Sequence, residues 1–149
     1  MTRTGILLLG LVLIAPVAPA LAQCGPSGRV TRIRPRPVAD SLLVGAEWLA
    51  AHRNDPGLVI LHATRSAAAY DSAHVPGSRP VLTTEFAPER NGRETELPAA
   101  ADLERLLTRK GVRADGRIIV TGDFLAATRL WFTLDYFGLG GRAAILDGG

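Results

Sequence analysis

The sequence has 149 residues, of which 47% are hydrophobic and 21% are charged, a composition that supports one buried core and excludes a disordered chain. The formal net charge of +3 is too small an excess to indicate a nucleic-acid-binding protein. Cys24 is the one cysteine, so a disulfide-stapled scaffold is also excluded.

Residues 1–22 have the layout of a secretory signal peptide. Arg3 precedes an apolar run over residues 6–15, and the segment ends on Ala20-Leu21-Ala22, the small residues that precede signal cleavage. A membrane-spanning anchor is disfavoured because the apolar run is too short and is followed by prolines. Arginines between positions 29 and 36 count against translocation under the positive-inside rule. We nevertheless predict export to the periplasm or the extracellular space, with cleavage after Ala22.

Residues 23–37 form a basic arm rich in glycine, proline and arginine, which ends at Arg34-Pro35-Arg36-Pro37. Its prolines favour extended backbone, so we predict a linker. A solvated tether is favoured over a phosphate- or lipid-binding segment because no aromatic residues are interleaved. Lipidation of Cys24 is the one alternative that would bring a membrane partner, and Gln23 fits a lipoprotein cleavage site poorly.

The remaining residues, 38–149, alternate between strand-like and helix-like patterns. Near-continuous apolar strands between helices predict an α/β fold with a mostly parallel central sheet and helices on both faces. Residues 83–96 are expected to form a polar, irregular surface loop. Strands are expected at 42–44, 58–61, 80–82, 118–120 and 144–146, and helices at 46–52, 66–70, 98–110 and 124–137.

In parallel sheets ligands bind at the carboxyl ends of the strands, which directs attention to residues 62–66 and 121–126. Asp123 is interpreted as the N-cap of the following helix, in preference to a nucleophile or a metal ligand. Arg65 and Arg129 lie near these loops and could contact an anion, although surface ion pairs are the favoured interpretation.

No metal site is expected at this edge. His62 and His74 would need at least one more ligand, and the sequence shows no metal-type spacing. We expect His74 to form a structural hydrogen bond in its turn. Trp48 and Trp131 lie on amphipathic helices and are expected to be core residues rather than substrate platforms.

Four groups of motifs occur in a characteristic order over residues 38–149. They are Val44-Gly45-Ala46-Glu47-Trp48-Leu49; Leu58-Val59-Ile60-Leu61 followed by Tyr70 and Ala73-His74-Val75-Pro76-Gly77-Ser78; Leu97-Pro98; and Ile118-Ile119-Val120, Arg129-Leu130-Trp131, Tyr136-Phe137-Gly138 and Leu146-Asp147-Gly148-Gly149. This order resembles that of a rhodanese-like domain, specifically the first, non-catalytic domain of a tandem-domain thiosulfate or 3-mercaptopyruvate sulfurtransferase. The resemblance implies sulfur transfer from thiosulfate or 3-mercaptopyruvate, through a cysteine persulfide, to cyanide or a thiol, without a further cofactor.

The resemblance also implies that this chain is not itself catalytic. The family places its cysteine in the loop after the central strand, and the corresponding loop here is degenerate and contains none. His62 stands where the family usually has aspartate. The expected partner is a second rhodanese domain that carries the cysteine and binds the small sulfur-containing anions. The degenerate loop comprises Thr121, Gly122, Asp123, Phe124, Leu125 and Ala126.

Two further expectations follow from the resemblance. The family continues past Asp-Gly-Gly into another helix, so the domain at 38–149 is expected to be C-terminally incomplete, leaving an apolar sheet face uncovered beside Ile145. The alternative function is a stand-alone inactive rhodanese module with a binding or regulatory role. Catalysis by Cys24 or Asp123 is disfavoured.

Overall fold

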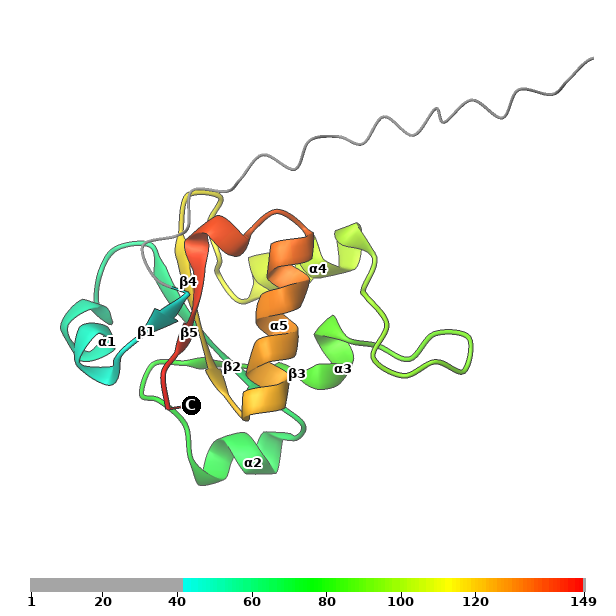
Figure 1. Ribbon diagram of the computed structural model, residues 1–149, viewed down its shortest axis with the longest axis horizontal. Helices are drawn as coiled ribbons and strands as arrows, with labels where there is room; N and C mark the ends of the chain where they lie inside the picture. Colours follow the sequence, from blue (N-terminus) through cyan, green and yellow to red (C-terminus); the bar gives the residue numbers. More distant parts are fainter. Residues whose placement is uncertain (1–41, 149) are drawn as a thin grey trace, which may run out of the picture. The chain divides into compact units, whose positions relative to one another are not determined.

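The computed structural model describes residues 42–148 (Figure 1). The predicted signal peptide at 1–22, the arm at 23–37 and Cys24 lie outside the described residues, so these interpretations remain predictions. No helix within 42–148 has the length and apolarity that crossing a membrane would require.

A parallel sheet of five strands forms the centre of the described region, in the order β1-β5-β4-β2-β3. The two long strands, β2 and β4, lie side by side, with Ile60 paired to Ile119 and His62 paired to Thr121. This arrangement confirms the predicted α/β fold with a parallel sheet. The strands are β1 (Leu43–Val44), β2 (Leu58–Thr64), β3 (Arg79–Leu82), β4 (Arg117–Gly122) and β5 (Ala143–Leu146).

Helices cover both faces of the sheet. Successive residues of a strand point to opposite faces, so β2 and β4 contribute to two separate cores. Leu61 and Val120 pack on the face that α3, α4 and α5 cover, and Ile60 and Ile119 pack with Leu49 of α1 on the other. The helices are α1 (Ala46–His52), α2 (Ala67–Ser72), α3 (Thr83–Phe86), α4 (Ala100–Arg109) and α5 (Phe124–Tyr136), with a 3₁₀ turn, η1 (Gly140–Arg142), before β5.

The segment 83–96 differs from the irregular surface loop that the sequence predicts. Its first four residues form α3, and Glu85 accepts a hydrogen bond from the backbone N–H of Leu82 at 2.9 Å. Phe86 is fully buried in the core. Farther along, Asn91 and Gly92 both have positive φ and turn the chain between Arg90 and Arg93, as an Asn-Gly hairpin requires.

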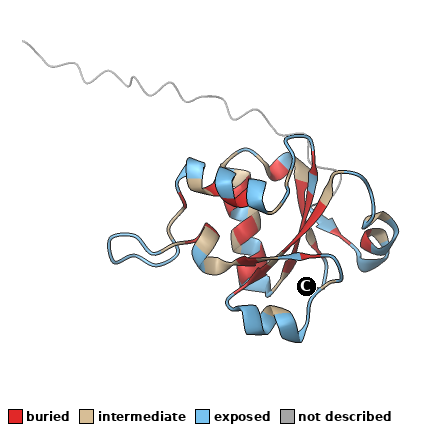
Figure 2. Cartoon of the chain, turned by 180° about the vertical axis from the view of Figure 1, so that it is seen from behind, coloured by how far each residue is buried: buried red, intermediate tan, exposed pale blue. Residues whose placement is uncertain are grey.

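The sheet face beside Ile145 is partly exposed, as the sequence predicts, because Leu43, which pairs with Ile145 across β1 and β5, is 48% exposed. Ile145 is half-buried against the core on the α5 side, and Ala144 and Ile119 on the opposite face are buried as well. Figure 2 shows the buried residues running along the sheet strands. Whether the domain continues past residue 149 remains a prediction.

Candidate functional site

The degenerate loop sits at the carboxyl end of β4, and only one residue, Asp123, connects this strand to α5. Gly122 ends the strand with a φ of +116°, and a Cβ atom there would overlap the carbonyl oxygen of Ala63 on β2. Glycine is therefore required on both conformational and steric grounds. The connection is too short to form a concave loop around a ligand.

Asp123 is the N-cap of α5, as its residue type and position predict. Its Oδ1 accepts hydrogen bonds from the backbone N–H groups of Leu125 at 2.8 Å and Ala126 at 3.3 Å. These amides are among the unpaired donors that every helix presents at its N-terminus. The carboxylate occupies the position in which a bound anion or thiolate would receive the same donors.

A ring cluster that the sequence did not predict lies beside this loop. His62 Nδ1 is hydrogen-bonded to Oγ1 of the buried Thr121 at 3.1 Å, and the His62 ring meets the edge of Tyr70 with centroids 5.3 Å apart. Tyr70 in turn stacks on His74 at 4.0 Å. The cluster joins the ends of β2 and β4 to α2 and the turn after it.

Hydrogen bonds to the backbone hold the outer part of this cluster. The Tyr70 hydroxyl donates to the carbonyl oxygen of Ser78 at 2.6 Å, and His74 Nδ1 donates to the carbonyl oxygen of Tyr70 at 2.9 Å. The predicted structural role of His74 is confirmed. The four-residue spacing of Tyr70 and His74, adjacent on a helical turn, was the available sequence signal.

Burial lowers the pKa of His62 from its usual 6.5, and the positive charge of nearby His74 lowers it further. The neutral imidazole is therefore the favoured form at neutral pH. A neutral imidazole and a hydroxyl can exchange hydrogen bonds with a polar group, but they supply no persulfide-forming nucleophile. Within residues 42–148, no three His, Cys, Asp or Glu side chains are placed to hold a metal ion.

The two arginines proposed as anion contacts differ in their surroundings. Arg65 is exposed after β2. Arg129 Nη2 donates to the carbonyl oxygen of Thr95, and its guanidinium lies 5.5 Å from the ring centroid of Phe132. Arg129 thus connects the loop before α4 to α5, and it has no ion pair with any of residues 42–148, contrary to the interpretation favoured from the sequence.

The tryptophans are partly buried, as core residues that reach the surface. Trp131 packs against the larger core and donates from Nε1 to the carbonyl oxygen of Ala143 at 3.0 Å. Trp48 packs against the second core, stacks on His52 at 4.1 Å and lies under the guanidinium of Arg117. Neither ring borders the degenerate loop at the carboxyl end of the sheet.

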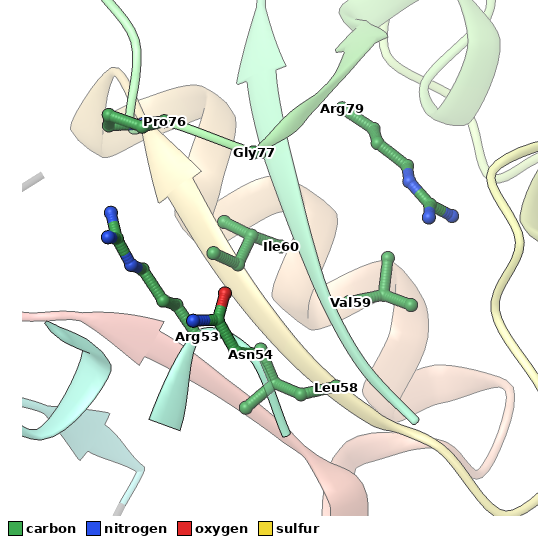
Figure 3. A pocket seen from close by; sticks show the side chains of 8 residues that line it. All are labelled: Arg53, Asn54, Leu58, Val59, Ile60, Pro76, Gly77 and Arg79. Atoms are coloured by element: carbon green, nitrogen blue, oxygen red, sulfur yellow. The ribbon is translucent and has the colours of Figure 1, made fainter. Parts of the chain in front are cut away.

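A cavity of about 250 Å³ lies at the opposite, amino end of β2 and is lined in part by Arg53 and Arg79 (Figure 3). Figure 3 shows these two guanidinium groups on opposite sides of β2, so they do not converge on one anion. Nη1 of Arg79 donates to the carbonyl oxygen of Lys110. This cavity does not contribute to the candidate site.

Comparison with known proteins identifies the family. Residues 45–149 match the rhodanese-like domain family. The chain is 33% identical over 97 residues to a putative thiosulfate sulfurtransferase, SseA, of Mycobacterium tuberculosis, covering 62% of this chain and 32% of the relative. It is 29% identical over 117 residues to the 3-mercaptopyruvate sulfurtransferase of Escherichia coli, covering 71% of this chain and 41% of the relative.

The fold agrees with these sequence matches. The crystal structure of SseA from Escherichia coli, a 3-mercaptopyruvate sulfurtransferase with a rhodanese fold, superposes with a TM-score of 0.59 at 24% identity, over 72% of this chain and 40% of that one. The chain therefore spans about a third to two fifths of the length of these relatives. This chain belongs to the rhodanese-like domain family.

Proposed function

We propose that this chain is a non-catalytic rhodanese-like domain that acts together with a second rhodanese domain, which carries the persulfide-forming cysteine. The relatives are named for thiosulfate and 3-mercaptopyruvate as substrates, and we extend that substrate class to the pair of domains. The observation that carries the proposal is the one-residue connection at Asp123 between β4 and α5.

Sulfur transfer through a persulfide requires a thiolate, and backbone amides at a helix N-terminus lower the pKa of a thiol placed against them. In this chain the amides of Leu125 and Ala126 are already hydrogen-bonded to Asp123. A carboxylate at that point also repels an anionic sulfur donor such as thiosulfate. The site therefore lacks the nucleophile, the free amides and the electrostatic attraction together.

One observation supports the alternative, a stand-alone inactive module with a binding role. Several large apolar side chains of α5 are exposed, and exposed apolar patches commonly mark interaction surfaces. This alternative shares the absence of catalysis with the main proposal. It differs in requiring no catalytic second domain.

A sulfur-transfer assay on the purified full chain tests the absence of catalysis. Thiosulfate or 3-mercaptopyruvate serves as donor and cyanide as acceptor, and thiocyanate formation is expected to equal the rate without protein. The Cys24→Ser variant is the matched control because Cys24 is the one thiol of the chain. Turnover that disappears in Cys24→Ser would show that the arm carries a catalytic cysteine and would overturn the proposal.

Export belongs to the proposal as well. If residues 1–22 are a signal peptide, the exported protein should begin at Gln23, which intact-mass measurement of the secreted or periplasmic fraction would reveal. A mature chain that begins at a lipid-modified Cys24 would instead support the lipoprotein alternative and a membrane partner. Retention of Met1 in the cell interior would contradict export.

A further inference from the structure

Most of the exposed apolar surface in residues 42–148 belongs to one helix. Of the six large hydrophobic residues that are exposed there, four lie on α5: Phe124 at 77%, Leu125 at 64%, Phe132 at 46% and Tyr136 at 64%. In Figure 1 this helix, drawn in orange, runs alongside β4 and β5, against which it packs. We call these four residues, together with Thr128, the α5 stripe.

The four-residue spacing of Phe124, Thr128, Phe132 and Tyr136 places these side chains on one side of the helix. The opposite side is buried in the core through Leu130 and Leu134. Since helix stability needs only the inner side to be apolar, the exposed parts of these aromatic side chains are not needed to hold α5 against the sheet.

Of the two hydroxyl groups in the stripe, that of Thr128 is already hydrogen-bonded within the chain. Thr128 Oγ1 donates to the carbonyl oxygen of Phe124 at 2.7 Å, and beside the stripe Arg129 donates to Thr95 while it lies over the Phe132 ring. Burying a hydroxyl that already has a partner avoids the cost of an unsatisfied polar group. The middle of the stripe can therefore be covered by a partner at little polar cost, whereas the Tyr136 hydroxyl at its end must keep its contact with water.

We propose that the α5 stripe is a self-association surface that binds the same stripe of a second copy of this chain. In an antiparallel, two-fold pairing of the two helices, Phe124 faces the partner's Tyr136. The small Thr128 then faces the partner's Phe132, so a large side chain fills the space that a small one leaves. A two-fold interface uses the same patch on both copies, and the alternation of large and small residues makes this stripe complementary to itself.

The exposed area sets the size of this interface, and interfaces at the low end of the size range are typical of weak, transient complexes. Three aromatic rings and one leucine at the observed exposures present about 500 Å² per copy, so that pairing buries about 1,000 Å² in all. This total lies at the lower limit for a specific interface. We therefore expect a reversible dimer with a Kd on the order of 10 µM, a species that forms only in concentrated solution or at high local concentration.

Sedimentation velocity of the full chain between about 1 and 300 µM spans the expected Kd. The parent chain should shift from monomer to dimer across this range. Phe132→Asp should raise the Kd at least about 30-fold, as loss of a central aromatic contact does, and Tyr136→Glu should do so at the end of the stripe. The second variant keeps the test valid if one substitution prevents folding.

Leu42→Asp is the matched control, because Leu42 is exposed to the same 46% as Phe132 and lies beside β1 instead of on α5. It should leave the Kd unchanged. A parent chain that stays monomeric at every concentration would overturn the proposal and leave the stripe to another occupant, such as a second domain. Equal weakening by Leu42→Asp, or full dimerisation of both α5 variants, would overturn it too.

Discussion

Replacing Asp123 by alanine tests whether this residue is a structural cap at the former position of an active-site loop. The substitution removes an acceptor for two backbone N–H groups, those of Leu125 and Ala126, at 2.8 and 3.3 Å. Losing an N-cap side chain costs about 1 kcal/mol, and losing a negative charge at a helix N-terminus adds about 0.3–1 kcal/mol at an exposed position. We expect the free energy of unfolding to fall by about 1.5 kcal/mol.

For a domain of this size, 1 kcal/mol corresponds to a shift of about 4–8 °C in Tm. Urea unfolding and thermal unfolding followed by circular dichroism measure both quantities. Asp123→Asn keeps an oxygen acceptor and loses the charge, so it should lose only about 0.5 kcal/mol. Asp115→Ala is the matched control for removing a surface carboxylate. Within the described region, the one ion pair of Asp115 is with the exposed Arg113, at 3.3 Å.

The reasoning fails if Asp123→Ala is as stable as Asp115→Ala, because the two hydrogen bonds would then contribute nothing. It also fails if Asp123→Asn is as unstable as Asp123→Ala, because the charge and not the acceptor would then be the cause. Freeing the two amides should not create sulfurtransferase activity, since residues 42–148 contain no cysteine.

Three other substitutions test separate features of the fold. Gly122 has a φ of +116°, and a Cβ atom there would overlap the β2 backbone, so Gly122→Ala should lower the free energy of unfolding in urea by at least about 3 kcal/mol. Gly138 also has positive φ but open space around it, so Gly138→Ala should lower it by only about 1–2 kcal/mol. Equal losses would refute the steric argument. Phe86→Ala should cost about 3–5 kcal/mol, as for a fully buried ring, and a loss below about 1 kcal/mol would remove α3 from the core. Because the pKa of His62 is lowered in the folded state, the unfolded chain binds more protons as the pH falls below 6.5, and stability must decrease there. His62→Gln should flatten this decrease as the pH falls through 6.5, and an unchanged slope would contradict the cause assigned to it.

The elements that the sequence predicts best are those whose signals are local. Apolar runs predicted β2 and β4, and the N-caps Ser66 and Asp123 were identified from residue type and position; Ser66 Oγ accepts from the N–H of Ala69 at 3.2 Å. The strand β2 runs three residues past the predicted end at Leu61, because Ala63 and Thr64 pair with β3. That extension depends on a neighbouring strand, which no local pattern contains.

The helix α3 was missed for a related reason. Four residues are too few to show helical periodicity, and Thr83 and Thr84 have low helix propensity. The burial of Phe86 between α5 and α4 stabilises this turn through tertiary packing, as is usual for short helices. A single phenylalanine in a polar stretch was the one local sign of this contact.

In the candidate site, too, the features that depend on neighbouring residues could be predicted and those that depend on distant residues could not. The cap at Asp123 follows from the residues on either side of it, but the contact of His62 with Thr121 joins positions 59 residues apart. It requires the register in which these two residues pair across β2 and β4, and a register cannot be read from one strand. The restraint of Arg129 by Thr95 likewise depends on where a distant loop folds back.

The geometry at residues 122–124 supports the proposed absence of catalysis on grounds other than the missing thiol. Amides at a helix N-terminus can bind a side chain of their own chain or an external anion, and a donor committed to one is withdrawn from the other. Here the Asp123 carboxylate accepts hydrogen bonds from these amides. Gly122 packs so closely against the β2 backbone that a longer loop would not fit at this position. Capping of the helix and binding of a persulfide would thus require the same backbone amides, and they cannot do both at once. A catalytic domain must leave the amides free, whereas this chain satisfies them.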